Sequence, residues 1–444
     1  MAMIVKNNMG AKNTLNELNK NEKAKSKDLK KLASGLKIGS AADDASGYAI
    51  SERMAVQIRG LDQDSQNTQN SQALMKTASG ALDSTMDILK TLKEKAINAA
   101  NDTNTDADRA TIQKEVTQAV QQIDENANVT YNGKTLLDGS KNSEVTGPNG
   151  SGTSTYLTNE YFADGTKKTS YITKLQSKTG ENLNILPGDK IIVSYVKNGV
   201  THTNADNPVT VTSRTRFGDM FEWKPCNQDL DIANYSYTSK IGVGANGEDV
   251  YTTSGQSAIS YHAKTEGLDG QIAGLTIRVE DSQGNPKKGI NAIMDNFNET
   301  IRAQDPSADN AMTFQVGTKA NQSIRLGFTD MRSYALGLAS KEGKAIDISS
   351  QASANAAISA FDNAVEKVLA QQTTLGAVTS RMDYTNANIV TANENVTASQ
   401  STISDADMAK EMTAFTKHNI LTQAAQSMLA QANQSSSSVL SLLQ

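Results

Sequence analysis

The residues that could perform chemistry in this chain are few and far apart. Its histidines are His202, His262 and His418, and none has a second histidine or a cysteine at the spacing of a zinc site. The single cysteine, Cys226, excludes an intramolecular disulfide framework. No motif of a zinc protease or of a serine hydrolase occurs. We therefore expect no enzymatic activity, no metal and no cofactor.

A literal G-x-G-x-x-G stands at Gly242, Gly244 and Gly247. A phosphate-binding loop needs a helix directly after its glycines, because the N–H groups at the start of that helix hold the anion. The residues that follow here, 248–253, look extended instead. The motif is interpreted as a turn.

Composition excludes several classes of partner. The net charge is −5 and 20% of residues are charged, whereas neutralising nucleic-acid phosphates needs a strong positive surplus. No stretch approaches the roughly 18 apolar residues that would cross a bilayer, so membrane insertion is not expected. Residues 1–8 lack the charged leader, apolar run and cleavage site of a secretory signal. Export, if it occurs, is expected to proceed without a cleaved signal peptide.

The prolines divide the chain into three parts. All six lie from Pro148 to Pro306. Because one proline inside a helix costs about 3 kcal/mol, its absence elsewhere permits very long helices at both ends. Only 37% of residues are hydrophobic, which suits long helices with narrow apolar stripes better than thick cores. The expected fold is therefore mainly α, with two helical flanks around a different middle.

The C-terminal flank carries a sustained heptad pattern. Its apolar residues recur at intervals of seven, at Phe361, Val368, Leu375, Met382, Ile389, Val396 and Ile403. Such a stripe predicts a coiled-coil helix over about 352–404. The companion positions turn polar at Gln372, Thr379, Asn386, Asn393 and Gln400. A narrow, half-polar seam suits a bundle whose partners are chosen by register.

The N-terminal flank has its own helical pattern. Apolar residues at three- and four-residue spacing are Met75, Ala78, Leu82, Leu89, Leu92, Ala96 and Ala99, followed by Ile112, Val116, Ala119 and Ile123. The pattern predicts two helices joined near 102–108. The first, over about 49–101, would be roughly 80 Å long and so match the C-terminal helix.

The two extreme ends also carry apolar stripes. These lie at Leu15, Leu18, Leu29, Leu32 and Leu36, and at Met408, Met412, Phe415, Leu421, Met428 and Leu429. One helix at each end is too thin to bury these stripes by itself. We therefore expect the ends to be disordered in the monomer and to fold on assembly.

The middle, residues 141–307, is rich in Thr, Tyr, Val and Gly. Strand-like runs such as 190–196 alternate with turn signals at Asn149-Gly150, Asn198-Gly199, Asn246-Gly247 and Asp269-Gly270. This predicts β-rich domain material. Further hairpin strands are expected at 314–316 and 323–328.

Three separated segments carry a family resemblance. Residues 34–50 read SGLKIGSAADDASGYAI, residues 129–140 read VTYNGKTLLDGS, and residues 403–434 read ISDADMAKEMTAFTKHNILTQAAQSMLAQANQ, with VLSLL at 439–443. Each resembles the corresponding segment of bacterial flagellins, in family order and at the family's distances from both ends. Together they cover roughly the first 140 and the last 135 residues.

The resemblance implies a domain organisation. Residues 1–43 with 408–444 would form a helical filament core, residues 44–140 with 308–407 an antiparallel coiled-coil-like rod with a small β-hairpin, and residues 141–307 a variable β-rich outer domain. The chain would polymerise into the flagellar filament for swimming motility. The contacts would come from the terminal apolar residues, with Asp43 and Asp44 near the join of core and rod. These two carboxylates fit a helix N-cap pair equally well.

The resemblance also implies partners and a location. The chain would leave the cell through the flagellar export apparatus and reach the extracellular flagellum. An export chaperone would cover the C-terminal stripe first, and filament-cap and hook-junction proteins would meet the polymer.

Flagellins of many species are sensed by a host Toll-like receptor, and here this sequence departs from the family. The sensed form resembles L-Q-R-V-R-E-L-A-V-Q, but residues 89–98 read LKTLKEKAIN. Thr91 replaces the first arginine and Lys95 replaces a leucine, so we expect weakened recognition. The receptor-facing residues would be Leu89, Lys90, Thr91, Lys93, Glu94, Lys95 and Glu115. The alternative is that both replacements are neutral changes on a solvated face.

Other functions remain open at this stage. A hook–filament junction protein shares flagellin-like ends but would cap the hook instead of building the propeller. The middle, which is studded with Ser and Thr, would also suit a filament-borne adhesin or a glycosylated surface.

Overall fold

The computed structural model describes residues 8–442 except 148–149, 151, 236–238 and 253–256. The predicted turn at Asn149 and the end of the VLSLL segment at residue 443 lie outside this range. The described chain divides into two compact units. The first combines residues 1–68, 315–322 and 384–444, and the second combines 69–314 and 323–383. These boundaries differ from the predicted ones, and the three-part division stays a prediction.

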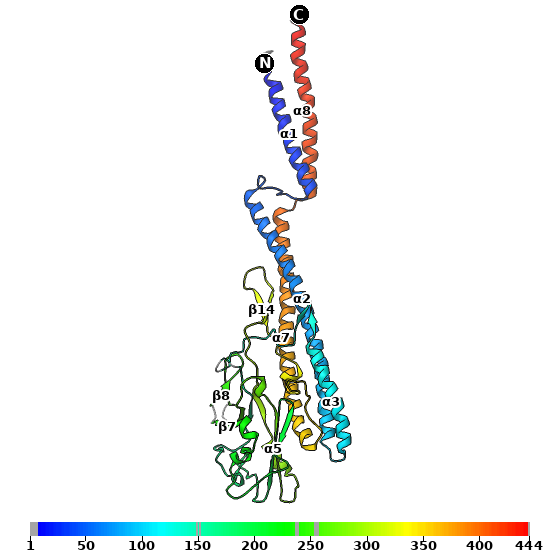
Figure 1. Ribbon diagram of the computed structural model, residues 1–444. Helices are drawn as coiled ribbons and strands as arrows, with labels where there is room; N and C mark the ends of the chain where they lie inside the picture. The colour runs from blue at the N-terminus through cyan, green and yellow to red at the C-terminus, as the bar shows by residue number, and fades with distance from the viewer. Residues whose placement is uncertain (1–7, 148–149, 151, 236–238, 253–256, 443–444) are drawn as a thin grey trace. The chain divides into compact units, whose positions relative to one another are not determined.

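Helices dominate both ends of the chain and strands dominate its middle (Figure 1). The long helices are α1 (Met9–Ser34), α2 (Ala45–Ala99), α3 (Asp106–Ala127), α7 (Gln351–Ser404) and α8 (Met408–Leu442). Short helices are η1 (Ile172–Lys174), η2 (Phe217–Phe221), α4 (Cys226–Asp229), η3 (Leu268–Gly270), α5 (Lys288–Met294) and α6 (Ser333–Leu336). This confirms the predicted mixture of long helices with β structure.

The strands are β1 (Thr130–Tyr131), β2 (Lys134–Thr135), β3 (Tyr156–Asn159), β4 (Lys190–Lys197), β5 (Val200–Thr203), β6 (Val209–Thr210), β7 (Leu230–Tyr235), β8 (Lys240–Val243), β9 (Asp249–Tyr251), β10 (Ala258–Ala263), β11 (Ile272–Glu280), β12 (Asn298–Ile301), β13 (Met312–Gln315) and β14 (Ser323–Leu326). One sheet has the order β12-β3-β10-β7, and a second has the order β11-β4-β5, with β6 also pairing with β4. The hairpins β1-β2, β8-β9 and β13-β14 stand apart from these sheets.

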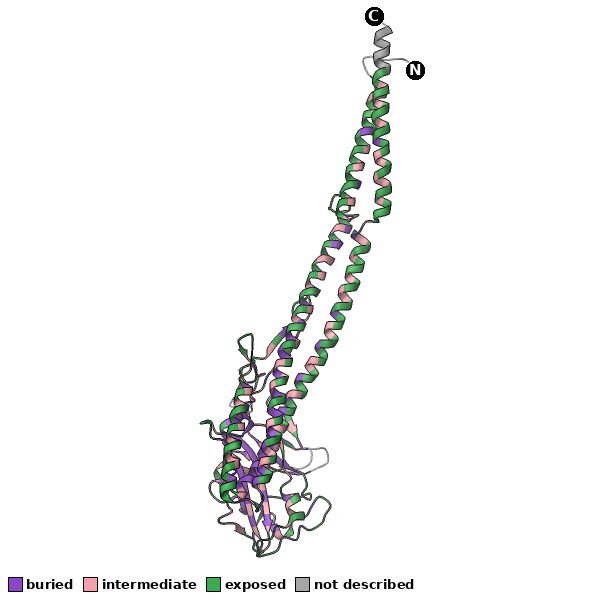
Figure 2. Cartoon of the chain, turned by 90° about the vertical axis from the view of Figure 1, so that its right-hand side faces the viewer, coloured by how far each residue is buried: buried purple, intermediate pink, exposed green. Residues whose placement is uncertain are grey.

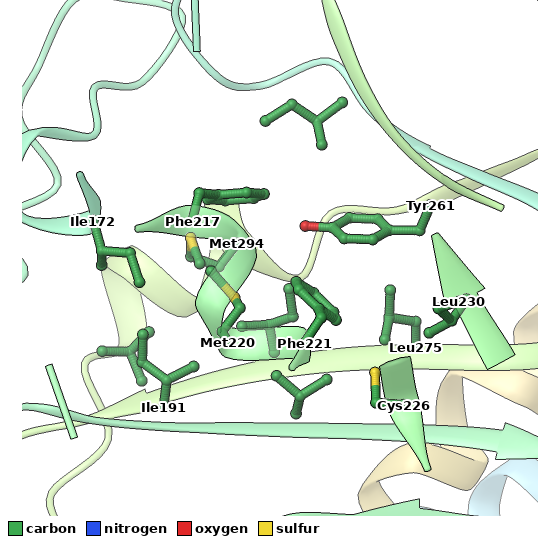
Figure 3. Packing of buried hydrophobic residues seen from close by; sticks show 14 of the residues in the cluster. Ile172, Ile191, Phe217, Met220, Phe221, Cys226, Leu230, Tyr261, Leu275 and Met294 are labelled. Atoms are coloured by element: carbon green, nitrogen blue, oxygen red, sulfur yellow. The ribbon is translucent and has the colours of Figure 1, made fainter. Parts of the chain in front are cut away.

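The β-rich middle has a hydrophobic core built from its strands and short helices. Aromatic side chains from η2 and β10 meet there, with the rings of Phe221 and Tyr261 4.6 Å apart (Figure 3). Burial raises the pKa of the Cys226 thiol to about 12, so this cysteine behaves as a small apolar side chain.

Two of the predicted turns close hairpins. Asn198 and Gly199 both have positive φ and join β4 to β5. The turn at Asn246-Gly247 joins β8 to β9. The G-x-G-x-x-G motif is therefore part of a hairpin. The predicted turn at Asp269-Gly270 is η3, a single 3-10 turn between β10 and β11, and it closes no hairpin because these two strands belong to different sheets. A Cβ on Gly270 would come within 2.0 Å of the Thr265 carbonyl oxygen, so this glycine serves a close approach.

The helical part of the second unit buries the predicted stripes. Every apolar position of the α2 pattern from Met75 to Ala99 is buried, as are Phe361, Val368, Leu375 and Met382 of α7. At the α2–α3 connection, Arg109 donates hydrogen bonds to the carbonyls of Ala99 and Asn101 and pairs with Asp106. This arginine satisfies backbone acceptors that the end of α2 leaves open.

The companion positions of the heptad pattern bind α2 in both units. In the second unit Gln372 donates to Asp83 at 2.7 Å, and Thr379 contacts the sulfur of Met75. In the first unit the amides of Asn386, Asn393 and Gln400 bond to Ser65, Asp62 and Ser51. The polar side of the predicted seam is thus a row of side-chain hydrogen bonds.

Within the first unit, the α1–α2 and α7–α8 connections pair with each other. Lys37 N–H donates to the Ser404 carbonyl at 2.7 Å, and Ala406 N–H donates to the Gly35 carbonyl at 2.9 Å. Gly35 ends α1 with φ +72°, a left-handed conformation that glycine adopts freely. Helices α1 and α8 run side by side from this paired connection (Figures 1 and 2).

Candidate functional site

Over the described part of the chain, no group of three His, Cys, Asp or Glu side chains is placed to hold a metal ion. Nor does any helix there have the length and apolarity to cross a membrane.

The α1–α8 pair has an unusual distribution of polar and apolar side chains. The covered face of α1 is formed by residues that recur at helical spacing, namely Ala11, Thr14, Leu18, Asn21, Lys25 and Asp28. The matching face of α8 includes Glu411, Ala414, Phe415, His418, Thr422 and Ala425. Across this seam Lys31 pairs with Glu411 at 3.0 Å, and the Asn8 amide donates to the Ala432 carbonyl. The two helices therefore meet mainly through polar and small residues.

Several large apolar side chains of the pair are exposed. On α8, Ile420 and Met428 are each 59% exposed and Met412 is 52% exposed, and on α1 Leu29 is 53% exposed. Further exposed members are Met9, Leu15, Met408 and Leu421. This inverts the usual pattern, in which large aliphatic side chains are the ones most often buried. On α8, Met412, Ile420 and Leu421 line one surface pocket, and an exposed apolar patch of this kind marks an interaction surface.

The predicted polymerisation residues fall into two groups. Leu15, Leu29, Met408, Met412, Leu421 and Met428 are exposed, whereas Leu18 is buried and Leu32, Leu36, Phe415 and Leu429 are half-buried. The exposed members are free to contact another molecule. Ile420 was missed, although it directly precedes Leu421 in the same stripe.

Asp43 and Asp44 have separate structural roles at the start of α2. The Asp44 carboxylate accepts from the N–H groups of Ser46 and Gly47 at 3.0 Å, which makes it an N-cap. Asp43 accepts from Ser40 and pairs with Lys27 at 3.1 Å, and this lysine holds the pKa of the Asp43 carboxyl below its usual value. Both remain exposed, so their predicted contacts in an assembly stay a prediction.

The predicted receptor-facing residues do not share one surface. Leu89 is fully buried in the second unit, because it belongs to the core stripe of α2, so its assignment to an outward face was wrong. Lys90, Thr91, Glu94 and Glu115 are exposed. Lys93 and Lys95 are half-buried by ion pairs, Lys93 with Asp362 and Lys95 with Glu115.

The polar residues of the α1–α8 seam were missed by the sequence analysis. Asp28, Lys31, Glu411 and His418 lie at positions that recur every three or four residues, so the signal was present. It was a polar periodicity. A search for apolar stripes passes over it.

Long helices at both ends of the chain, with large apolar side chains exposed on α1 and α8, are typical of a structural subunit that associates with other molecules. The comparisons with known proteins give this class a name. The chain belongs to the bacterial flagellin family, the structural subunits of the flagellar filament that drives swimming. The family's N-terminal helical region matches residues 5–142, and its C-terminal helical region matches residues 358–443.

Two full-length relatives agree with this assignment. A flagellin of Clostridium tyrobutyricum is 34% identical over 97% of this chain and 99% of its own length. A flagellin of Bacillus subtilis strain 168 is 30% identical over 99% of this chain and 100% of its own length. Among solved structures, the flagellar junction protein FlgL of Legionella pneumophila covers 75% of this chain and 99% of its own, with 14% identity and a TM-score of 0.29.

Proposed function

We propose that this chain polymerises through the outward apolar faces of α1 and α8. The observation that carries the proposal is the inverted seam, in which polar residues face inward and residues such as Met412 and Ile420 face solvent. Burying one such side chain contributes about 1.5–3 kcal/mol, which an isolated chain forgoes. A surface that meets a different surface on the next copy, with a rotation that does not close, generates a helical filament.

The same exposed faces support the proposed partners. An aliphatic surface on α8 needs cover before assembly, because exposed patches of this kind aggregate. An export chaperone that binds this face, passage through the flagellar export apparatus and an extracellular location are parts of the proposal. Contacts with filament-cap and hook-junction proteins would use the same ends of the chain.

Seeded growth tests the proposal. Purified chain is mixed with fragments of its own filaments, and elongation is followed by light scattering and negative-stain microscopy. The full chain should elongate the seeds, and a version without residues 1–43 and 408–444 should not. Ile420→Ser with Met428→Ser should slow growth by about tenfold or more, because two apolar side chains that the proposed assembly would bury become polar.

The matched control is Gln426→Ser, which changes an exposed polar residue of the same helix. Growth of the double variant at the rate of this control would contradict the proposed faces. If sheared native filaments contain the chain only as a trace band, the junction-protein reading replaces the filament subunit. Added sugar detected on residues 141–307 by mass spectrometry would support a glycosylated surface in addition.

We also propose weakened recognition by the flagellin-sensing Toll-like receptor. The supporting observation is the ion pair of Lys95 with Glu115, both on the face that the family resemblance assigns to the receptor. This ion pair occupies the Glu115 carboxylate, which would otherwise be free to contact the receptor. Thr91 lacks the guanidinium group that would donate two parallel hydrogen bonds. Its hydroxyl donates instead to the Asp87 carbonyl of its own helix.

A reporter-cell titration tests this second proposal. Thr91→Arg with Lys95→Leu should increase potency by about tenfold over the natural chain, because it supplies a guanidinium and frees Glu115. Lys90→Gln, a change at an exposed neighbour, should leave potency unchanged. Equal potency of the natural chain and the double variant would contradict the proposal.

A further inference from the structure

Four asparagines of this chain are followed directly by glycine, namely Asn132, Asn149, Asn198 and Asn246. Glycine has no side chain to shield its main-chain nitrogen, so this nitrogen can attack the side-chain carbonyl carbon of the preceding asparagine. The reaction needs no enzyme, and it is one reason that asparagine counts as a thermolabile residue. Asn149 lies outside the described residues, and the surroundings of the other three differ.

Asn132 and Asn198 occupy turns with the same backbone conformation. Asn132 joins β1 to β2 and Asn198 joins β4 to β5. The two asparagines have φ of 50° and 51°, and the glycines that follow them have φ of 72° and 69°. Because the two backbones match, a difference in reactivity between these asparagines comes from what surrounds each turn.

The turn at Asn198 is held on both sides of the bond that would react. The Asn198 side-chain amide donates a hydrogen bond to the Asp269 carbonyl at 3.1 Å. Gly199 is buried, and a Cβ there would come within 2.8 Å of the Lys344 carbonyl oxygen and 2.9 Å of the Ser340 nitrogen. The attack needs the side chain and the main chain to rotate, so it must break this hydrogen bond inside a crowded site.

The turn at Asn246 is held on one side only. Asn246 is exposed, but the Gly247 N–H donates to the Gly244 carbonyl at 3.0 Å. This nitrogen must leave its hydrogen bond before it can attack. We therefore expect Asn246 to react at an intermediate rate.

The turn at Asn132 is held on neither side. Asn132 and Gly133 are both exposed, and no hydrogen bond joins the Asn132 side chain or the Gly133 N–H to any residue that the structure describes. A Cβ on Gly133 would meet no atom within 4 Å, so the turn has room to rotate. Strands β1 and β2 have two residues each, and so short a hairpin opens easily.

We propose that Asn132 is a site of spontaneous deamidation, in which the Gly133 nitrogen attacks the Asn132 side-chain carbonyl carbon. A bond forms between these two atoms, and the Gly133 nitrogen gives up its proton to water. The bond from the carbon to Nδ2 then breaks, and the amide group takes up a proton and leaves as ammonia. Water opens the resulting cyclic imide at either of its carbonyl groups. One product is aspartate and the other is isoaspartate, whose main chain runs through the former side chain.

Both products change the β1–β2 hairpin. Each adds a negative charge to the exposed turn, and isoaspartate also lengthens the main chain between the paired residues Tyr131 and Lys134. The register of this short hairpin depends on the length of its turn, so isoaspartate should loosen it. The modification is independent of polymerisation.

Peptide mapping of the full-length, folded chain tests the proposal. The chain is kept in mildly alkaline buffer, and samples taken over time are acidified, digested with an acid protease and analysed by mass spectrometry. Deamidation makes a peptide about 1 Da heavier. The Asn132 peptide should convert at least about fivefold faster than the Asn198 peptide, because one hydrogen bond alone accounts for about that factor. The Asn246 peptide should lie between them.

The same chain in concentrated urea is the matched control. There the three rates should come together, because the turns no longer differ in their surroundings. Asn132→Gln should abolish the heavier product of its peptide, because glutamine places its carbonyl carbon one bond further from the Gly133 nitrogen. Equal rates for Asn132 and Asn198 in the folded chain would overturn the proposal, as would an equally large spread of rates in urea. A product at residue 132 that is aspartate without isoaspartate would also overturn it, because the imide yields both.

Discussion

Two helical regions of this chain use apolar residues in opposite ways. In the second unit, α2, α3 and α7 turn their apolar stripes toward each other and toward the loops that cover them, and residues such as Leu89 and Phe361 are fully buried. In the first unit, α1 and α8 meet through polar residues and leave Leu29 and Ile420 exposed. Both regions are long antiparallel helices without proline. What differs is whether a third layer covers the stripe within the chain.

Apolar stripes of similar sequence can therefore serve either the folding of the chain or its association with other molecules. A stripe that other parts of the same chain cover contributes to the folding of that chain, whereas an uncovered stripe contributes only when another molecule arrives. Residues of the first kind should therefore control unfolding, and residues of the second kind should control association.

The largest effect is expected from the buried ion pair of the second unit. Lys367 of α7 lies 3.6 Å from Glu299 of β12, and both side chains are almost completely buried. Lys367→Met should lower the free energy of unfolding by about 3–5 kcal/mol, because Glu299 is left buried without its closest cation. Denaturant unfolding followed by circular dichroism measures this loss. Adding Glu299→Leu should recover part of it, and no recovery would contradict the pairing.

Leu89 and Leu29 are a matched pair of leucines, the first buried within the chain and the second exposed. Leu89→Ala should lower the unfolding free energy by about 2–5 kcal/mol, because it leaves a cavity in the core. Leu29→Ala, at a position 53% exposed, should change it by less than about 0.5 kcal/mol while slowing seeded growth. The same denaturant titration and growth assay serve both variants. Similar losses of stability in the two variants would end the distinction between covered and uncovered stripes.

The start of α2 should give a smaller effect. Asp44→Ala removes the acceptor for the N–H groups of Ser46 and Gly47, so the helix should lose about 1 kcal/mol of local stability. Faster hydrogen exchange across residues 45–50 would show the loss. Asp44→Asn keeps an acceptor oxygen and should stay near the natural value. Equal exchange in the alanine and asparagine variants would refute the capping role.

The smallest effect is a dependence of stability on pH in the β-rich middle of the second unit. Burial lowers the pKa values of His202 and His262 in the β-rich middle. A histidine whose folded-state pKa is depressed stabilises the fold above its unfolded pKa, near 6.5, and that stability is lost as the pH falls below it. The melting temperature of this part should therefore fall between pH 7 and pH 5.

The control for this pH dependence replaces a histidine with an aromatic ring that does not titrate. His262 stacks on Tyr156 with ring centres 5.2 Å apart, and His262→Phe keeps an aromatic ring in that place. This variant should lose part of the acid-induced fall in melting temperature. An unchanged fall would assign the acid sensitivity to other groups.

Much of the helical architecture could be predicted from the sequence, because its signal is periodic and local. The heptads from Phe361 to Ile389 and the stripe from Met75 to Ala99 predict which face is buried, and the structure buries them. The polar companions, such as Asn393, were expected to choose a partner, and they bind α2. The hairpin at Asn198-Gly199 follows from the left-handed backbone that both residues accept.

Other features depend on contacts that a sequence pattern does not contain. Asp269-Gly270 has the composition of a hairpin turn, yet Gly270 is required by the nearby Thr265 carbonyl. Leu89 belongs both to the segment assigned to the receptor surface and to the apolar stripe of α2. In the structure its side chain is buried in the core. The covered face of α1 could not be predicted, because the burial of Asp28 depends on how α8 lies against it. The apolar residues of α1, taken alone, predict that the opposite face of this helix is the covered one.

The paired connections at Gly35 and Ser404 have a mechanical consequence for a propeller that rotates. A pull applied along α8 reaches Ala406, whose N–H donates to the Gly35 carbonyl, and the force therefore passes into the segment that follows α1. The load is shared by two backbone segments instead of one. Hydrogen bonds that run between adjacent segments resist such a load together, so this joint should transmit torque where a single linker would twist.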